Sequence, residues 1–468
     1  MRPSTTLSLS CILPLLLGPV QAQEPGQRWG SSNSSGYISK YATALRSAGL
    51  NGFADTLTKI NGTAPATALF SQLASGRNFT VFAPDDAAIR RIPAAVSQNR
   101  TLLAEYISYH FVDGDFTNRS DTTSSGGRGP GASQTETATA AQATAALLGR
   151  RVVLRDEDWC GGGGGGSNNS SGPAPNPPPF AGIWPNVTLG RTLLNASALV
   201  ALGAHKSQVL AWTRVSPDGN ITILNQAADT TVGNATRWRN LSINPINNTL
   251  IPPGNLTTAL TAIKASALQG VLGGVQIPSA RGVNTPAVLA LQRARGITVF
   301  VPANDAFTDA VNGSLQGLQG NASALTALVQ NHYINGTTLY STQLADNTTA
   351  VSAAGEPLHF VTNATGTFVA GANSTTARVV HPDVLLDNGV AHIIDQVLFA
   401  AESDPAQAAS AYESATSAAA AYSTTETGPI GVGPGGARPT PLTSTEPGGG
   451  GGGGGGGMTT VTVQPSYR

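Results

Sequence analysis

The alternation of apolar and polar positions is nearly the same in two stretches that lie far apart in the chain. Thr80–Ile89 reads TVFAPDDAAI, and Thr298–Phe307 reads TVFVPANDAF. In each stretch, β-branched and aromatic residues that end at a proline predict a short strand. The acidic or amide residues that follow predict the start of a helix, because their side chains accept hydrogen bonds from the unpaired amides of a first turn.

A leucine-rich run with helical spacing follows each stretch and ends in a histidine. A repeat of this length is much longer than the roughly 20 to 50 residues of a solenoid unit, so it indicates two copies of one domain. The two runs end in Tyr109-His110 and in Asn331-His332-Tyr333.

The same kind of pattern predicts the other elements. A helical pattern near the N-terminus is divided at Gly49 and Gly52. The predicted helices are 37–57 in two parts, 102–111, 256–271, 304–311 and 325–333, and the predicted strands are 79–83, 147–154, 187–194, 209–215, 221–224, 297–301, 357–361, 367–370, 377–380 and 391–398.

These elements and the shifts in composition divide the chain. The first domain is predicted at 36–253 and the second at 254–402. Gly-, Ser- and Pro-rich stretches within 118–181 are expected to be disordered insertions in the first domain, and the Ala-, Ser-, Thr-, Pro- and Gly-rich tail 403–468 is also expected to be disordered.

The N-terminus is typical of an export signal at residues 1–22. Arg2 precedes an apolar run, and Val20-Gln21-Ala22 supplies the small-residue cleavage pattern. The run is too short for a membrane span, which needs about 20 apolar residues, so no transmembrane segment is expected after its removal. The polar C-terminus also lacks the hydrophobic tail of a lipid-anchor signal.

Charge and cysteine content narrow the class of protein. The net charge is zero and 11% of the residues are charged, so nothing indicates the basic stripe of a nucleic-acid-binding protein, and no nucleic-acid partner is expected. Cys11 lies in the signal, so Cys160 is the single cysteine of the mature chain and no internal disulfide is expected. Cys160 is either incidental or the site of an intermolecular bridge.

Asn-x-Ser/Thr acceptors occur at twenty positions, a density that indicates a glycoprotein of the secretory route. The expected location is therefore extracellular or in a cell wall. The candidate glycosylation sites are Asn61, Asn78, Asn186, Asn220, Asn234, Asn240, Asn255, Asn312, Asn335, Asn347, Asn363 and Asn373.

Three ordered motifs resemble those of fasciclin-like domains: the stretch Thr298–Phe307, the helix that ends at His332, and Gly389–Leu398. The chain resembles a secreted two-domain member of the fungal kind. The resemblance implies an α+β fold in which each domain is a β-sandwich or wedge of short strands packed with several helices. It also implies an adhesion or matrix protein that binds extracellular proteins or cell-wall polysaccharide, without catalysis, cofactor or metal.

The first domain departs from this pattern, because Asn244 and Asn247 stand where the second domain has His392 and Asp395. Any role of that histidine and aspartate is expected to be absent or altered there. Positions three apart on a strand face opposite sides, so we expect His392 and Asp395 to be structural and not a catalytic or metal pair.

The two histidines at helix ends have two possible roles, one structural and one in contact with a partner. A cation or a donor to the last carbonyls is favourable at a helix end, which gives His110 and His332 a structural reading. In animal relatives of the family a Tyr-His motif is linked to receptor adhesion. The resemblance therefore makes Tyr109, His110, His332 and Tyr333 the candidate contact residues.

No enzyme signature is present. Asp85, Asp86, Asn304 and Asp305 are explained by helix capping, and the six histidines lack metal-ligand spacing. A secreted enzyme acting on carbohydrate or ester substrates is the first alternative. A vacuolar or endoplasmic-reticulum glycoprotein is the second, because it would share the signal and the glycosylation sites.

Overall fold

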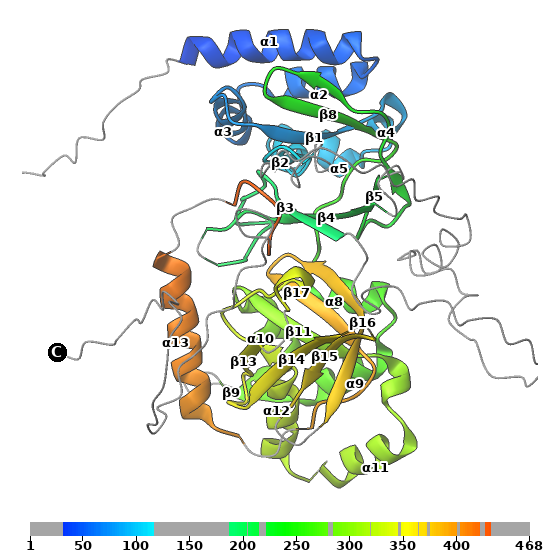
Figure 1. The fold of residues 1–468 in the computed structure, drawn as a ribbon, viewed down its shortest axis with the longest axis vertical. Helices are drawn as coiled ribbons and strands as arrows, with labels where there is room; N and C mark the ends of the chain where they lie inside the picture. The colour runs from blue at the N-terminus through cyan, green and yellow to red at the C-terminus, as the bar shows by residue number, and fades with distance from the viewer. Residues whose placement is uncertain are drawn as a thin grey trace, which may run out of the picture.

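The computed structural model describes residues 31–116, 187–203, 205–214, 221–278, 284–318, 320–344, 348–363, 365–371, 375–399, 403–421 and 426–431. These residues form two α+β domains, which follow one another along the long axis of the molecule (Figure 1). The predicted signal at 1–22, the predicted insertions from 118 to 181, the strand predicted at 147–154, and Cys160 lie outside them.

Polar side chains cap the starts of α3, α4 and α6 in the first domain. The Asp85 carboxylate accepts a hydrogen bond from the Ala88 amide at 2.6 Å, which confirms its predicted capping role. The first helix begins five residues earlier than the predicted domain start and is separated from the second around Gly49, as predicted. The helices are α1 (Ser31–Ser47), α2 (Asn51–Ile60), α3 (Ala64–Leu73), α4 (Asp86–Arg90), α5 (Ala94–Ser97) and α6 (Arg100–Ser108).

The strands of the first domain form two four-stranded sheets. One has the order β2-β1-β8-β7, with β1 and β8 parallel, and the other has the order β3-β4-β5-β6. The strands are β1 (Phe79–Pro84), β2 (Phe111–Asp113), β3 (Val187–Arg191), β4 (Val209–Arg214), β5 (Ile221–Ile223), β6 (Thr230–Thr231), β7 (Thr236–Trp238) and β8 (Leu241–Ile246).

The helices of the second domain differ from the prediction in three places, one of which is α10 (Ala287–Arg293), a helix that was not predicted. The helix predicted at 256–271 is two helices, because Lys264 adopts a left-handed φ of 54° between them. The helix predicted at 304–311 is a 3₁₀ turn, η1 (Asn304–Ala306), followed by a separate helix. The α-helices are α8 (Leu256–Ala262), α9 (Ser266–Gly274), α10 (Ala287–Arg293), α11 (Asp309–Leu318) and α12 (Ala322–Asn331).

The second domain joins its main strands into one seven-stranded sheet of order β12-β11-β17-β16-β15-β14-β13. The long strand β16 makes this possible, because it pairs with β15 at one end and with β17 at the other. The strands are β9 (Gln276–Pro278) and β10 (Asn284–Pro286), which form a separate pair, and β11 (Ile297–Pro302), β12 (Tyr333–Ile334), β13 (Thr348–Val351), β14 (Pro357–Asn363), β15 (Gly366–Ala370), β16 (Thr376–Leu386) and β17 (Gly389–Ile394).

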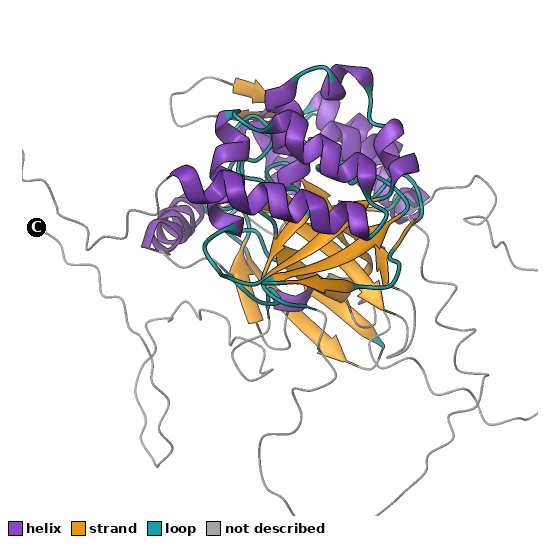
Figure 2. Cartoon of the chain, turned by 90° about the horizontal axis from the view of Figure 1, so that it is seen from above, coloured by secondary structure: helices purple, strands orange, loops and turns teal. Residues whose placement is uncertain are grey.

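The strand registers show that the two domains are copies. In the first domain the parallel strands β1 and β8 pair Phe82 with Asn244, and in the second β11 and β17 pair Phe300 with His392. The helices gather on one side of the strands (Figure 2). Each domain therefore has a helical layer over the central sheet, and a second apolar core lies on the other side, around Phe82 and Phe300.

The two domains share a buried interface. Leu189 of the first domain packs in one apolar cluster with Tyr340, Leu385 and Val390 of the second. Hydrogen bonds also join the two domains. In one of them, the side-chain amide of Gln208 donates to the carbonyl of Leu386 at 3.0 Å. The domains thus bury side chains against each other.

The prediction of a disordered tail from 403 onwards is wrong for its first part. Pro405–Ala421 forms the helix α13, drawn in orange beside the second domain in Figure 1. Alanine has the best intrinsic helix propensity, and it makes up much of this segment. Residues 426–431 return to the first domain.

Candidate functional site

The helix-terminal histidine occupies the same hydrogen-bonded position in both domains. His110 donates from Nδ1 to the carbonyl of Tyr106 at 3.2 Å, and its Nε2 accepts from the amide of Leu250 at 3.0 Å. His332 donates from Nδ1 to the carbonyl of Leu328 at 2.8 Å, and its Nε2 accepts from the amide of Leu398 at 3.0 Å. One ring nitrogen donates and the other accepts, so both rings are neutral.

Burial keeps these rings neutral. It lowers the pKa of His110 and of His332 to about 4, because a charged imidazole would lose its hydration in the core. Of the two alternatives for the helix end, a cation or a donor to a last-turn carbonyl, the structure shows the donor.

The four candidate contact residues are all buried. Tyr109 and His110 have no exposed surface, and His332 and Tyr333 are each 6% exposed. The Tyr109 hydroxyl donates to the carbonyl of Val209 at 3.0 Å and so ties the helical half of the domain to its second sheet. The Tyr-His motif therefore does not lie on the surface, and direct contact with a partner is not open to these side chains in this structure.

His392 is fully buried in the strand β17. Its Nε2 donates to the carbonyl of Leu339 at 2.8 Å, and its Nδ1 accepts from the amide of Asp383 at 3.3 Å. Asn244, at the same register position in the first domain, bonds instead to the carbonyl of Ser242 at 3.1 Å. The role of His392 is therefore altered in the first domain, in agreement with the expectation.

The expectation is wrong for Asp395. Asp395 accepts from the Arg378 amide at 2.7 Å, and its own amide donates to the Arg378 carbonyl. In the first domain, Asn247 accepts from the Thr231 amide at 2.9 Å, and its amide donates to the Thr231 carbonyl. An amide oxygen accepts as a carboxylate oxygen does, so Asn247 retains the position and the bonds of Asp395.

A polar cluster that the sequence did not predict surrounds His392. Both oxygens of the buried Asp383 carboxylate accept from Ser341, Oδ1 from its amide at 2.7 Å and Oδ2 from its hydroxyl. Asp383 has a left-handed φ of 58° at an irregularity of β16, and its carbonyl accepts from Asn225 of the first domain at 2.8 Å. Burial raises the pKa of Asp383 and lowers that of His392.

This cluster contains a serine, a histidine and an aspartate, as the catalytic triad of a hydrolase does, but their hydrogen bonds differ from those of a triad. A nucleophilic serine must give its proton to a base such as histidine. The Ser341 hydroxyl donates to Asp383, and both nitrogens of His392 are engaged by backbone groups. These hydrogen bonds satisfy a buried carboxylate and do not activate a nucleophile.

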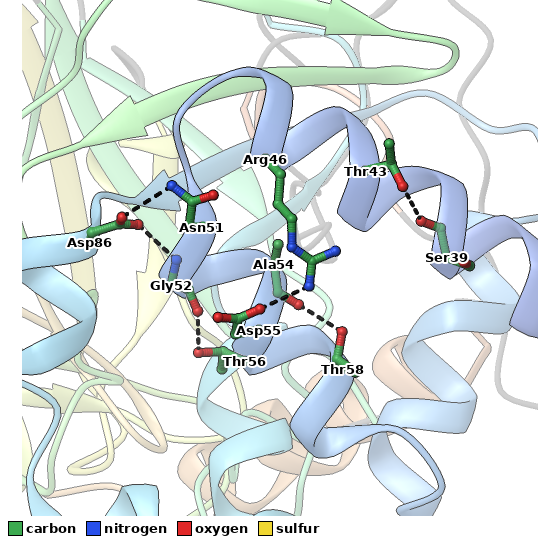
Figure 3. Close-up of polar contacts among 10 residues, drawn as sticks. All are labelled: Ser39, Thr43, Arg46, Asn51, Gly52, Ala54, Asp55, Thr56, Thr58 and Asp86. Carbon is green, nitrogen blue, oxygen red and sulfur yellow. Dashed lines mark hydrogen bonds and ion pairs between the residues drawn. The ribbon is translucent and has the colours of Figure 1, made fainter.

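The polar residues that follow Pro84 and Pro302 are also structural. Asp86 accepts from the amide of Gly52 at 2.7 Å, at the start of α2 (Figure 3). In the second domain Asn304 accepts from the amide of Ala267 at 3.2 Å, at the start of α9. The same position of the repeat therefore caps the same helix in both copies, but this helix is α2 or α9 and not the one that Asp86 and Asn304 were predicted to begin.

The second domain has an apolar cavity between β11, α9, α11 and α12, next to His332 and Tyr333. Its volume is about 30 Å³. By comparison, a cavity that holds benzene measures about 150 Å³. The cavity is therefore a packing gap and not a site for an organic ligand.

An open face of the second domain lies on β14–β16. The side chains of β14 alternate between exposed and buried, and Val361 is 40% exposed. Phe368 of β15 lies directly opposite Val361 and also opposite Arg378 of β16. Val380 of β16 is 38% exposed. We call Val361, Phe368, Arg378 and Val380 the outer sheet face, in which the two valines are exposed and Phe368 and Arg378 are partly buried.

The predicted glycosylation sites fall into three groups. Asn61, Asn78, Asn234, Asn312 and Asn363 are exposed, and Asn240, Asn255 and Asn335 are partly buried. Asn186, Asn220, Asn347 and Asn373 lie outside the described residues.

The described residues contain no group of three or more His, Cys, Asp or Glu side chains that could hold a metal ion. No helix in the same part of the chain is long and apolar enough to cross a membrane.

Comparison with known proteins identifies the family. A model of the fasciclin domain matches residues 40–152 and 254–400, so the chain belongs to the fasciclin domain family and carries the domain twice. A fasciclin-like arabinogalactan protein, elcF, from Phaeosphaeria nodorum is 26% identical over 209 residues, which are 45% of this chain and 58% of that protein. The chain thus matches little more than half the length of this relative.

A solved structure is also similar. It is a FAS1 domain pair from the insect cell adhesion molecule fasciclin I, with 13% sequence identity and a TM-score of 0.29. The match covers 76% of this chain and 98% of that one.

Proposed function

We propose that this protein is a secreted glycoprotein of the cell surface or extracellular matrix, and that it mediates adhesion by binding proteins or polysaccharide through its fasciclin domains. The observation that carries the proposal is the presence of two fasciclin domains in one chain. The exposed acceptor asparagines support glycosylation, and the export pattern at 1–22 supports secretion.

The proposed contact surface is the outer sheet face of the second domain. It supersedes the buried Tyr-His motif, because a partner can reach Val361 and Val380 without unfolding the domain. Aromatic and arginine side chains are the residue types that contribute most to protein interfaces, and an aromatic ring can also stack on a sugar ring. Phe368 and Arg378 supply these two groups on adjacent strands.

Binding of the full-length protein to immobilised wall polysaccharides and matrix proteins tests both statements. Val361→Asp and Val380→Asp place charge on the outer sheet face and are expected to weaken saturable binding on the order of tenfold. Leu289→Asp is the matched control, because Leu289 is 41% exposed on α10, away from this face. Equal binding by all three variants would reject the surface. Absence of saturable binding by the wild type would reject the adhesive function.

The enzyme alternative receives no support from the Ser341–Asp383–His392 cluster, because the hydroxyl of Ser341 is bonded to the carboxylate. The alternative of a protein retained in the vacuole or endoplasmic reticulum concerns location only. Quantification of the protein in culture medium and in cell extract separates that alternative from secretion.

A further inference from the structure

The described parts of the C-terminal segment contact the same turn of the repeat in both domains. The turn follows the helix-terminal histidine by four residues and contains Gly114 in the first domain and Gly336 in the second, with φ of 114° and 80°. In each domain the threonine of the central strand holds this turn: Thr80 donates to the carbonyl of Gly114 at 3.0 Å, and Thr298 donates to that of Thr337 at 2.8 Å.

Helix α13 covers the turn of the second domain. A Cβ atom on Gly336 would lie 3.0 Å from the ring of Tyr412, so the helix packs closely on the glycine. The start of α13 is fixed as well, because the amide of Asp404 donates to the carbonyl of Ala354 at 2.8 Å. Helix α13 is therefore attached to the second domain at two points.

Residues 426–431 cover the turn of the first domain. The carbonyl of Thr427 lies so close to Gly114 that a Cβ atom would collide with it. The amide of Ile430 donates to the carbonyl of Leu189 at 2.8 Å, on the edge of β3 that is not paired with β4. Figure 1 shows this segment in orange-red beside β3.

The same short segment also fills the interface between the domains. The side chain of Ile430 is 2% exposed and packs with Leu189 of the first domain and Val390 of the second. Gly431 lies against Thr342 of the second domain, where a Cβ atom would come within 2.7 Å of the Thr342 carbonyl oxygen. Six residues of the tail therefore touch both domains.

An ion pair fixes the beginning of the segment. The side chain of Arg191 on β3 is only 5% exposed, and its Nε donates to the carboxylate of Glu426 at 2.7 Å. A second guanidinium nitrogen donates to the carbonyl of Ser207 at 2.9 Å. A buried arginine without a counter-charge is strongly destabilising, so the position of Glu426 matters to the first domain.

We propose that α13 and residues 426–431 form an intramolecular clasp that holds the two fasciclin domains in one fixed arrangement. Helix α13 lies on the second domain and residues 426–431 lie on the first, where Ile430 completes the apolar cluster between the two domains. Without it, the edge of β3 is open, Arg191 loses its carboxylate, and the interface loses a buried side chain. The domains then move relative to one another.

Hydrogen–deuterium exchange of the full-length protein tests the clasp. Glu426→Gln and Ile430→Asp are expected to accelerate exchange about tenfold both in peptides covering Val187–Arg191 and in peptides covering Leu385–Val390, because segments that lose buried contacts open more often. Glu413→Gln is the matched control, because Glu413 is exposed on α13, and it is expected to leave exchange unchanged.

Each outcome of the exchange experiment either supports or overturns the clasp. Unchanged exchange in both variants overturns the proposal. Faster exchange at Val187–Arg191 alone also overturns it, because the segment would then stabilise one domain and not the arrangement of the two. The charge exchange Arg191→Glu with Glu426→Arg tests the ion pair. Slow exchange in the double variant, with fast exchange in Arg191→Glu, supports the pairing, and equally fast exchange in both rejects it.

Discussion

The Nε2 atom of His332 accepts a 3.0 Å hydrogen bond from the backbone amide of Leu398. The bond joins the end of α12 to the segment that follows β17, so it connects the helical layer of the second domain to its C-terminal segment. His110 and Leu250 make the same bond over the same distance in the first domain. The histidine at the end of this helix is therefore a structural acceptor in each copy, where it satisfies a buried backbone amide.

Replacing this histidine should destabilise the fold. His332→Ala leaves the Leu398 amide without an acceptor in the core and removes buried ring volume, with an expected loss of roughly 2 to 4 kcal/mol in the free energy of unfolding. His359→Ala is the control, because His359 is exposed on β14, and its effect should stay within about 0.5 kcal/mol. Urea unfolding measures both. A loss below about 1 kcal/mol for His332→Ala would contradict the structural role.

Stability should fall between pH 6.5 and pH 4. The pKa values of His110 and His332 are lowered from 6.5 to about 4 in the folded protein, so the unfolded chain binds more protons in this range. The free energy of unfolding is expected to decrease by up to about 1.4 kcal/mol per pH unit for each histidine. Burial raises the pKa of Asp113 and of Asp383, and this contributes the opposite slope.

The free energy of unfolding is measured at several pH values for wild type and for His332→Gln. The difference between the two proteins isolates the contribution of His332. The variant retains a polar side chain without a titrating ring. Its stability should depend less steeply on pH between 4.5 and 6, and identical slopes would mean that His332 is not the group that titrates.

Asp395→Asn should be nearly neutral. Asn247 already makes the equivalent bond to the Thr231 amide in the first domain, so an amide oxygen is sufficient as the acceptor for Arg378. Asp395→Ala removes that acceptor and is expected to cost about 0.5 to 1.5 kcal/mol. Thermal unfolding of the two variants side by side decides the point. Equal losses would show that the negative charge, and not the hydrogen bond, is required.

Ser341→Ala should affect stability and not catalysis. It removes the hydroxyl donor of the buried Asp383 carboxylate, at an expected cost of about 1 to 3 kcal/mol. Ester and glycoside hydrolysis assays on wild type and variant accompany the unfolding measurement. A hydrolytic activity that disappears in a folded Ser341→Ala variant would favour the enzyme alternative.

Asn240 should carry no glycan in the folded protein, although it lies in an acceptor motif. Its side-chain amide donates to the carbonyls of Leu73 at 3.0 Å and Arg77 at 2.6 Å, and its oxygen accepts from the Tyr37 hydroxyl. A sugar on this nitrogen would displace one of the two bonds. Asn363 is exposed in the β14–β15 turn and should be modified. Glycopeptide mass spectrometry reads out both, and a high occupancy at Asn240 would contradict the expectation.

Some features were predictable because their causes are local. The strand that ends at Pro84 and the cap at Asp85 depend on neighbouring residues, and both were predicted. The helix α3 was missed, although Thr63 caps it and a proline lies in its first turn, which is a usable start signal. The tail helix α13 was missed because alanine-rich segments are compatible with both helix and low-complexity sequence.

Other features had no local signal. Ser341 and Asp383 meet across 42 positions of sequence, and Asp383 has a left-handed backbone that its residue type does not demand. The burial of the Tyr-His motif was missed because a helix-terminal tyrosine and histidine look the same in sequence whether the turn faces solvent or the second sheet. These outcomes depend on which layers pack over the helix end.

The amino-acid sequence alone was sufficient to establish the duplication, the α+β class and the family, because these follow from periodicity and from motifs repeated in order. It was not sufficient to show which side chains are reachable, how Asn247 takes the place of Asp395, or how the tail joins the domains. Those features depend on long-range contacts, in which burial and hydrogen-bond partners come from segments that are distant along the chain.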